Sequence, residues 1–539
     1  MSENLTADRL PDLVFGLAGP LGVNLEIVSD SLRQALAAVN YKAFPLKLTK
    51  ENSYYESAAK KKGDDYFSVM KYKMDHATTL CSDRNDPAFH ARLAVMAIRE
   101  RRSALENGVL GSGPAAGYII HQLKRPAEVA LLRSVYGEQF ILISVHASLE
   151  ERKHQIHSSL KRTLPPRAPE SEIQQKLNAL IEIDEDEGIG ASGQQLREVF
   201  QLGDVFISAE FRQLLDSNMK RFVDALFGNC AASPNKDEFG MYAAKGASLR
   251  SCDLSRQVGA AILSQDGDLL SQGCNEVPKA LGGTYWDGDT TDYRDISVGF
   301  DPNQRETREV LRDLFQTLLV SGYLSEDAKK MGGPSEIVDQ LIRKKEAPND
   351  VDGALSASSI RDITEYGRSV HAEMSAICDA ARTGRSLQGA TLFCTTFPCH
   401  NCTKHILSAG IRRVVFIEPY PKSRAQALFD NEIDFAGRAD DKVRFEPFLG
   451  ISPAIYRTIF QKGRRKDASG QAKKWVLGEP RPMIRVIFPA YLFLEAEALR
   501  PIVESPKSSN APTTKKRARA KHKTIPSKKT SPTRRSRRR

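Results

Sequence analysis

Two short runs of residues constrain this chain more than any other feature of its sequence. They are His371-Ala372-Glu373 and, further along, Pro398-Cys399-His400-Asn401-Cys402. One imidazole and two thiolates form a ligand set that suits zinc, and three protein ligands leave the fourth tetrahedral position open. A structural zinc site would close that position with another Cys or His, and we expect His400 to point away from the ligands. The predicted ligands of one zinc ion per chain are His371, Cys399 and Cys402.

The spacing of the two cysteines places both of them at the start of a helix. Residues three apart share a helix face, and Pro398 suits a first turn because it has no amide hydrogen to leave unpaired. The positive end of that helix favours the thiolate, which is the form that binds metal. A second helix is predicted over residues 371–382, where apolar residues recur at helical spacing.

Strand-like runs alternate with these two helices. Residues 390–397 and 413–417 are rich in β-branched and aromatic side chains. Upstream, residues 258–263 and 269–273 predict two strands joined by an Asp-Gly turn. The sequence therefore predicts a layered α/β domain with both ligand-bearing helix starts at one edge of its sheet.

Each half of the motif is ambiguous by itself. A lone C-x-x-C also fits a redox pair or half of a structural zinc site. Joined in this order, the two halves are typical of zinc-dependent nucleobase deaminases. Glu373 is not needed as a ligand, so we expect it to carry protons from water to the ring nitrogen and the leaving amino group. The expected reaction hydrolyses a C–N bond in the cyclic amidine of an aminated base.

Further strings extend the pattern to a known family. Residues 255–260 (Ser-Arg-Gln-Val-Gly-Ala) and 273–278 (Gly-Cys-Asn-Glu-Val-Pro), together with both metal motifs, resemble the deoxycytidylate deaminase branch of the cytidine deaminase superfamily. The resemblance implies a deoxycytidine nucleotide substrate and a three-layer α/β/α domain over residues 231–504. It also implies substrate contacts from Asn275 and Ala372. Judged from the residues alone, Asn275 could equally well stand in a turn because asparagine tolerates the backbone conformations found there.

The chain is longer than small deoxycytidylate deaminases at two places, an N-terminal region of about 230 residues and an insertion at 279–370. These two additions, together with the strings 365–374 and 417–423, resemble the anti-phage dCTP/dCMP deaminases. That resemblance implies an N-terminal P-loop nucleotide-kinase-like parallel-sheet domain over residues 1–230, a homo-oligomer, and depletion of the dCTP pool as defence. Some members of that family are held inactive by a partner RNA.

The N-terminal region contains a glycine-rich turn between a predicted strand and a predicted helix, a context in which backbone amides bind phosphate. The predicted nucleotide-binding residues are Gly19, Gly22 and Asn24. Val23 and Asn24 occupy the Lys and Ser/Thr places of a P-loop, so the fixed charge for a transferred phosphate is missing. A regulatory nucleotide site, an active kinase and a purely structural domain all stay open. The acidic run 184–187 either holds a metal or is a solvated loop.

The insertion is polar at first and then helical around residues 307–321. It contains no Cys and no His before His371, so we predict no second zinc. Trp286 and Tyr293 either form a lid over the nucleotide phosphates or belong to an ordinary ordered loop.

Basic charge is concentrated at the C-terminal end. The net charge is +11, yet residues 505–539 hold 14 of the 78 Lys and Arg and no acid, leaving 64 basic against 67 acidic residues elsewhere. This low-complexity segment is predicted to be disordered. It suits contact with RNA or DNA backbones, with a solvated extension as the alternative.

The remaining expectations concern location and function class. No apolar stretch approaches 18 residues and eight cysteines suit a reducing compartment, so we expect a cytoplasmic protein with no membrane contact. A deaminase of free nucleotides is the first reading. A polynucleotide-editing deaminase is the alternative, supported by the basic tail, and a catalytically inactive binding module is the third.

Overall fold

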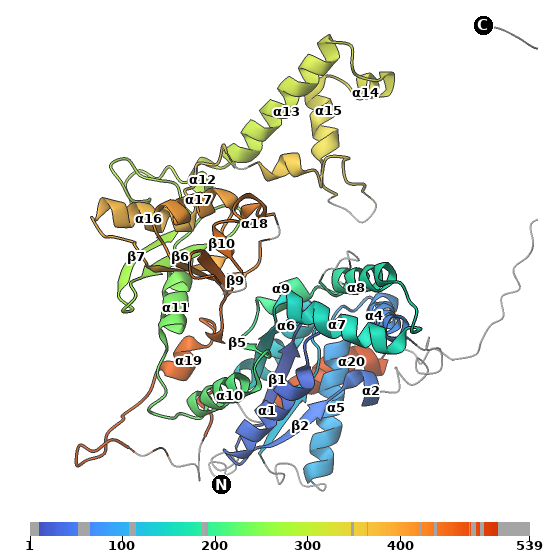
Figure 1. Ribbon diagram of the computed structural model, residues 1–539, viewed down its shortest axis with the longest axis vertical. Coiled ribbons are helices and arrows are strands. Elements are labelled where there is room, and N and C mark those ends of the chain that lie inside the picture. The colour runs from blue at the N-terminus through green and yellow to red at the C-terminus, as the bar shows by residue number, and fades with distance from the viewer. Residues whose placement is uncertain are drawn as a thin grey trace, which may run out of the picture. The chain divides into compact units, whose positions relative to one another are not determined.

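The computed structural model describes residues 10–51, 65–106, 115–185, 187, 192–345, 350–363, 365–420, 422–435, 439–473, 475, 481–485 and 490–504. These residues form a mixed α/β structure with two six-stranded sheets (Figure 1). By internal contacts, residues 1–499 form one compact unit and residues 500–539 a second. The predicted basic tail, residues 505–539, lies outside the described residues. No described helix is long and apolar enough to cross a membrane.

The N-terminal sheet has the strand order β12-β5-β4-β1-β3-β2. Its strands are β1 (Leu13–Ala18), β2 (Lys42–Leu46), β3 (Ala116–Ile120), β4 (Phe140–His146), β5 (Val205–Ser208) and β12 (Gly450–Ile451). The first five are parallel to their neighbours, whereas β12 pairs antiparallel with β5. Because helices cover both faces of a parallel sheet, its central strands read as continuous apolar runs, as β1 and β4 do.

Helices follow the strands of this sheet in the order expected for parallel crossovers. They are α1 (Leu25–Ala37), α2 (Leu48–Glu51), α4 (Tyr66–Asp83), α5 (Phe89–Glu106), α6 (Pro126–Tyr136), α7 (Leu149–Thr163), α8 (Glu170–Glu185), α9 (Leu196–Phe200) and α10 (Arg212–Leu226). Helices α1 and α10 share one buried apolar cluster with β1, β4 and β5. The predicted parallel-sheet class is confirmed for this region, and its kinase-like identity stays a prediction.

The second sheet has the order β10-β11-β9-β8-β6-β7. Its strands are β6 (Gly259–Leu263), β7 (Leu269–Cys274), β8 (Thr391–Thr396), β9 (Arg413–Glu418), β10 (Ile433–Asp434) and β11 (Val443–Pro447). The predicted hairpin is confirmed as β6 and β7, which pair antiparallel, and β8 to β11 run parallel to one another. A Cβ atom at Gly273 would lie 2.5 Å from the carbonyl oxygen of Ala372. Only glycine therefore lets the helix that begins at Ala372 approach β7 this closely.

Helices cover both faces of the second sheet, giving three layers (Figure 1). They are α11 (Lys236–Ser248) on one face and α16 (Ala372–Arg382) and α17 (His400–Ser408) on the other. Successive side chains of β6 point to opposite faces of the sheet, as expected for a strand. Ala260 and Ile262 pack with α16 and α17, and Ala261 and Leu263 pack with α11.

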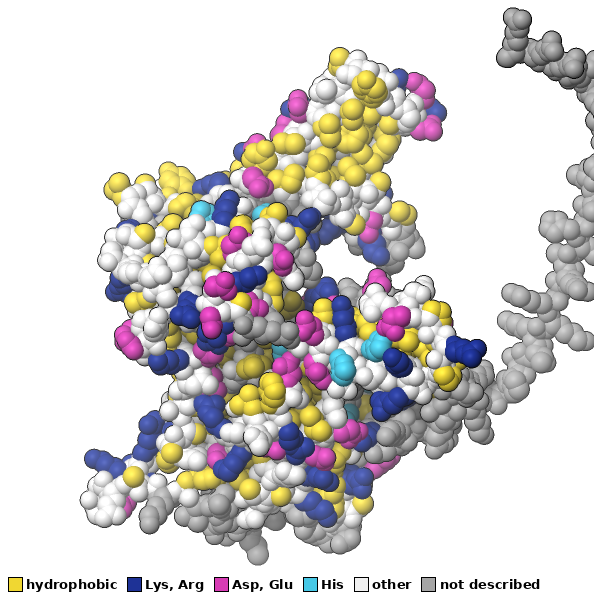
Figure 2. Space-filling view, viewed as in Figure 1, with side chains coloured by type: hydrophobic (Ala, Val, Ile, Leu, Met, Phe, Trp, Pro, Cys, Tyr) yellow, Lys and Arg dark blue, Asp and Glu magenta, His cyan; other side chains and the backbone are white. Residues whose placement is uncertain are grey.

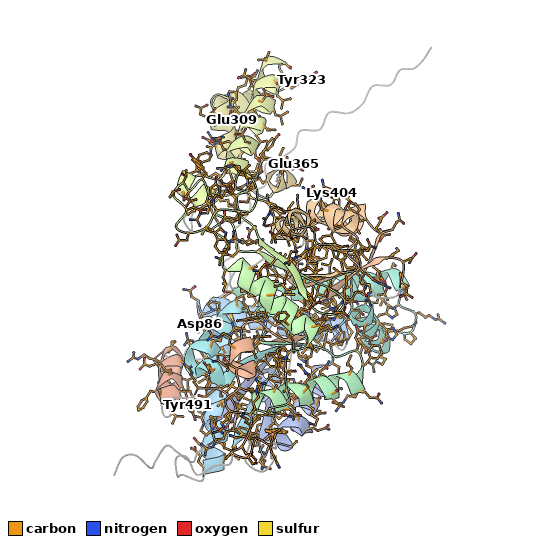
Figure 3. The ribbon with its side chains drawn as sticks, turned by 90° about the vertical axis from the view of Figure 1, so that its left-hand side faces the viewer. Asp86, Glu309, Tyr323, Glu365, Lys404 and Tyr491 are labelled. Atoms are coloured by element: carbon orange, nitrogen blue, oxygen red, sulfur yellow. The ribbon has the colours of Figure 1, made fainter. Side chains whose placement is uncertain are left out.

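The insertion forms a helical arm, composed of α12 (Asp295–Val298), α13 (Pro302–Val320), α14 (Glu326–Lys330) and α15 (Pro334–Ile342). The helix predicted around residues 307–321 is confirmed, but it begins earlier, because the Asp301 side chain accepts hydrogen bonds from the first amides of α13. Apolar side chains gather on the surface of the arm (Figure 2), and Tyr323, labelled in Figure 3, is 80% exposed.

The chain returns to the N-terminal sheet near its end. After α18 (Ala425–Leu428) and β12, the short helix α19 (Tyr456–Phe460) packs into the cluster of α1 and α10. Helix α20 (Ala490–Glu504) carries Glu495, which is fully buried and bonded to Arg102 through both carboxylate oxygens, at 2.7 and 2.8 Å. Strand β12, helix α19 and Glu495 thus contact the N-terminal sheet or the helices on it, and the predicted domain boundary at 230/231 stays a prediction.

Candidate active site

The starts of two helices bring the predicted ligands together. His371 is the residue before the first turn of α16, and Cys399 holds the same position before α17. The Nδ1 atom of His371 lies 3.3 Å from the Sγ atom of Cys399 and 3.3 Å from that of Cys402. All three ligand atoms lie within 4.8 Å of one another. Among the described residues, this is the group of His, Cys, Asp and Glu side chains whose geometry suits a metal.

The chemistry of this donor set fits zinc. The amide of Cys402 points at the Cys399 sulfur, at 3.5 Å, as expected for a sulfur placed before a helix. Hydrogen bonding, first to Cys402 and then to His371, lowers the pKa of Cys399 to about 4, so this sulfur is a thiolate at neutral pH. One imidazole and two cysteines are zinc ligands, and three of them leave one position for water or substrate.

Glu373 is the second residue of α16 and lies beside this ligand set. Its side chain is buried, with the residue only 4% exposed. Burial raises the pKa of its carboxyl group above the usual value, and the charge of His371 lowers it in part. A carboxyl group whose pKa is moved toward neutrality can both accept and return a proton. The geometry therefore suits the acid–base role expected of Glu373.

A cavity of about 340 Å³ opens beside the ligand set. Five of the predicted site residues line it, namely Asn275, His371, Ala372, Glu373 and Cys399. The cavity is also lined by His400, which we expected to point away from the ligands. Its Nδ1 atom is buried and has no hydrogen-bond partner among the described residues, and it is not part of the metal-ligand group.

Asn275 fixes one wall of the cavity through its side-chain amide. Its Oδ1 atom accepts a hydrogen bond from the amide of Val258 at 2.7 Å, and its Nδ2 atom donates to the carbonyl of Arg256 at 2.8 Å. An Nδ2 group carries two hydrogens, so one donor is left for a further partner. The structure thus gives Asn275 an architectural role, beside the substrate contact that the family resemblance implies.

Several residues of the cavity wall were not among the predicted site residues. The insertion contributes Asp295, Asp301, Asn303 and Arg368, and the segment after β9 contributes Tyr420 and Lys422. Arg368 is held in place by Asp295, at 3.0 Å, and by the carbonyl of Tyr293, at 2.7 Å. Arg368 could have been noticed in the sequence, because it belongs to the string 365–374 that resembles the anti-phage dCTP/dCMP deaminases. Its contact with residues about seventy positions earlier carries no local signature.

The expected lid residues do not contact the cavity. Trp286 and Tyr293 are 57% and 55% exposed and are not part of its lining. Trp286 instead stacks against the guanidinium of Arg250, whose central carbon lies 3.6 Å from the ring centroid. Of the two readings of this segment, the structure supports an ordered loop.

The predicted nucleotide-binding residues lie elsewhere, at the carboxyl end of β1. Gly19 and Gly22 belong to the loop that joins β1 to α1, and Gly22 has a φ of +94°, which glycine adopts readily. The Asn24 side chain caps α1 by accepting from the amides of Glu26 and Ile27. None of the three lines the cavity beside His371.

Comparison with known proteins agrees with this site. Residues 234–418 match the family model "Cytidine and deoxycytidylate deaminase zinc-binding region". The chain is 46% identical over 55 residues to "Deoxycytidylate deaminase" of Enterobacteria phage T2, covering 10% of this chain and 29% of the relative. It is 33% identical over 97 residues to the protein of the same name from Pongo abelii, covering 17% and 47%. The chain thus spans less than half the length of these curated relatives.

Among solved structures, the dCMP deaminase from cyanophage S-TIM5, in complex with dCMP and dUMP, is 18% identical. The match covers 40% of this chain and 98% of that chain with a TM-score of 0.21, so no argument rests on it. The matched zinc-binding region and the His/Cys/Cys geometry agree that the cofactor is zinc.

Proposed function

We propose that this chain is a zinc-dependent hydrolase that deaminates deoxycytidine nucleotides. The observation that supports this most is the buried carboxyl group of Glu373 on the same cavity wall as the zinc ligands His371 and Cys399. A purely structural zinc site has no need of a buried acid beside it. The family match over residues 234–418 and the deoxycytidylate deaminase relatives support the same substrate class.

The chain's own residues supply binding and proton transfer. His371, Cys399 and Cys402 would hold the zinc ion, which would lower the pKa of a water molecule that it binds. Glu373 accepts one proton from the attacking water and delivers it to the ring nitrogen. It then accepts the second proton of that water, from the hydroxyl group now on the ring carbon, and passes it to the amino group, which leaves as ammonia. The overall reaction consumes one water, replaces the amino group by a carbonyl oxygen and releases ammonia.

Three cationic side chains face the cavity and suit a nucleotide phosphate. They are Arg256, Arg368 and Lys422, which come from three separate segments of the chain. Arg256 also pairs with Glu418, and Arg368 pairs with Asp295, so both guanidinium groups are held in place before substrate arrives. We therefore expect charged nucleotides to bind better than free deoxycytidine.

We further propose that both dCMP and dCTP are substrates and that consumption of dCTP restricts phage replication. A homo-oligomer, a regulatory nucleotide at the N-terminal sheet and RNA contact through residues 505–539 stay predictions. Polynucleotide editing is the second candidate, because 14 basic residues and no acid lie in that tail. Outside the tail the net charge is slightly negative, which does not favour a nucleic-acid groove.

A substrate panel tests the proposal. Purified full-length protein is incubated with dCMP, dCTP, CMP, dAMP, deoxycytidine and single-stranded DNA, and ammonia and products are measured. We expect dUMP and dUTP, with deoxycytidine at least about tenfold poorer in kcat/KM because it lacks the phosphate contacts. Product from DNA alone would overturn the proposal in favour of editing.

A further inference from the structure

The loop between β1 and α1 holds a carboxylate from a distant part of the chain. The amide of Leu21, within this loop, donates to Oδ2 of Asp184 at 2.6 Å. Asp184 lies in the last turn of α8 and is fully buried, with 0% exposure. At a strand–loop–helix turn, amides that point at an anion are the usual means of binding phosphate. Here the anion is a side chain of the protein.

A lysine supplies the positive charge that the loop's own sequence lacks. Lys124, a few residues after β3, donates from Nζ to Oδ1 of Asp184 at 2.6 Å and to the carbonyl of Gly19 at 2.9 Å. Its side chain is nearly as buried as that of Asp184. The loop therefore has both components of an oxyanion site, an amide donor and a cation, although the motif position for lysine holds Val23.

A second cation borders the same loop. Arg152 of α7 donates from Nε to the carbonyl of Leu21 at 3.2 Å and from Nη1 to Glu185 at 3.2 Å. The residue is 8% exposed, and its Nη2 atom is buried with no partner among the described residues. Gly22 permits this approach, since a Cβ atom there would lie 2.7 Å from the carbonyl oxygen of Arg152.

We propose that the Gly19–Asn24 loop is an oxyanion site for phosphate whose resident anion is the Asp184 carboxylate. The site takes an external phosphate only when that carboxylate is removed. The Leu21 amide, Lys124 and Arg152 form its wall. This inference concerns the N-terminal sheet and does not depend on the deaminase proposal.

The arrangement has a physical rationale. A buried lysine and a buried amide are costly unless an acceptor satisfies them, and Asp184 satisfies both. With the carboxylate in place, phosphate would have to bind beside a like charge in a buried site, which is unfavourable. With the carboxylate absent and its space empty, Lys124 and the Leu21 amide are left without an anion. Arg152 keeps its partner Glu185 and adds a buried Nη2 donor with no partner among the described residues. External phosphate then becomes the natural replacement.

The test compares Asp184→Ala with wild-type full-length protein, using inorganic phosphate as the probe against matched sodium chloride. We expect thermal melting and calorimetry to show saturable phosphate binding by Asp184→Ala, with a Kd at least about tenfold lower than for wild type. Asp184→Asn is the matched control. Its amide still fills the space and accepts from Leu21, so it should not gain phosphate binding. The double variant Asp184→Ala/Lys124→Met should bind phosphate no better than wild type, because it lacks the lysine cation.

Three outcomes would overturn the proposal. The first is an Asp184→Ala protein that folds and binds phosphate no better than wild type. The second is an Asp184→Ala protein that fails to fold even when produced in phosphate buffer, because phosphate should replace the carboxylate. The third is ATP binding by the wild type that Lys124→Met abolishes, which would place a phosphate at the loop with Asp184 still present.

Discussion

At the scale of single residues, the proposed ligand Cys402 and the nearby Cys378 have different environments. Cys402 is fully buried beside His371, whereas Cys378, on α16, is exposed. We expect Cys402→Ser to lose most bound zinc, because a serine hydroxyl is a poor zinc ligand, and Cys378→Ser to keep it. Zinc content per chain, measured on purified proteins by mass spectrometry, checks this. Equal zinc in both variants would place the metal elsewhere.

A buried histidine makes stability depend on pH. Desolvation, as the largest cause, lowers the pKa of His90 to about 3, from an ordinary value of 6.5. Below pH 6.5 the unfolded chain binds a proton at this residue and the folded protein does not, so this stability is present above pH 6.5 and lost as pH falls toward 3. The expected slope is about 1.4 kcal/mol per pH unit.

The His90→Gln variant isolates this contribution. Its free energy of unfolding, from denaturant titrations between pH 7 and 4.5, should fall less steeply with falling pH than that of wild type. The difference in slope should correspond to about one proton fewer taken up on unfolding. The neighbouring Cys81 and Glu128 are retained in both proteins, so the difference belongs to the histidine. Parallel pH profiles for the two proteins would contradict the assignment.

The grouping of the three predicted zinc ligands could be expected from the sequence because the placement of each is local. His371 and Cys399 each stand directly before a helix, and the turns at the helix starts are encoded by neighbouring residues. The contacts of Asp184 could not be predicted, since its partner Leu21 lies 163 positions earlier. The acidic run was expected to hold a metal or face solvent, and Asp184 instead forms a buried ion pair.

At the scale of elements, strands with clear apolar patterns were predicted well. Strands β6, β7, β8 and β9 fall within one residue of their expected positions. The contact of β12 with the N-terminal sheet was not expected, because a two-residue strand has no periodicity to detect. The docking of α20 was also missed, since it depends on a buried pair between Arg102 and Glu495.

That pair yields a prediction about α20. Arg102→Met leaves Glu495 buried without its guanidinium partner, which should lower the free energy of unfolding by about 3–5 kcal/mol. Arg102 also pairs with the buried Asp12, at 2.8 Å, so the double variant Arg102→Met/Glu495→Leu removes one of the two carboxylates left without the guanidinium and should recover part of the loss. Denaturant midpoints of the three proteins measure this. A single variant as stable as wild type would show that α20 is not anchored through Arg102.

At the scale of the whole molecule, charge is divided between the tail and the rest of the chain. Residues 505–539 carry 14 basic side chains and no acid, and the remaining chain has a net charge of −3. We expect deletion of residues 505–539 to weaken RNA binding at least about tenfold at low salt and to flatten its salt dependence. Unchanged affinity and salt slope, in filter-binding titrations, would exclude the tail as the contact.

In the proposed reaction, Glu373 moves protons at a zinc site that acts on a deoxycytidine nucleotide. The most direct measurement is the rate of ammonia release from dCMP by Glu373→Gln protein that contains as much zinc as wild type. Glutamine keeps the size of the side chain but cannot accept a proton, so kcat should fall at least about 100-fold. A zinc-loaded Glu373→Gln protein that deaminates dCMP at the wild-type rate would contradict the claim.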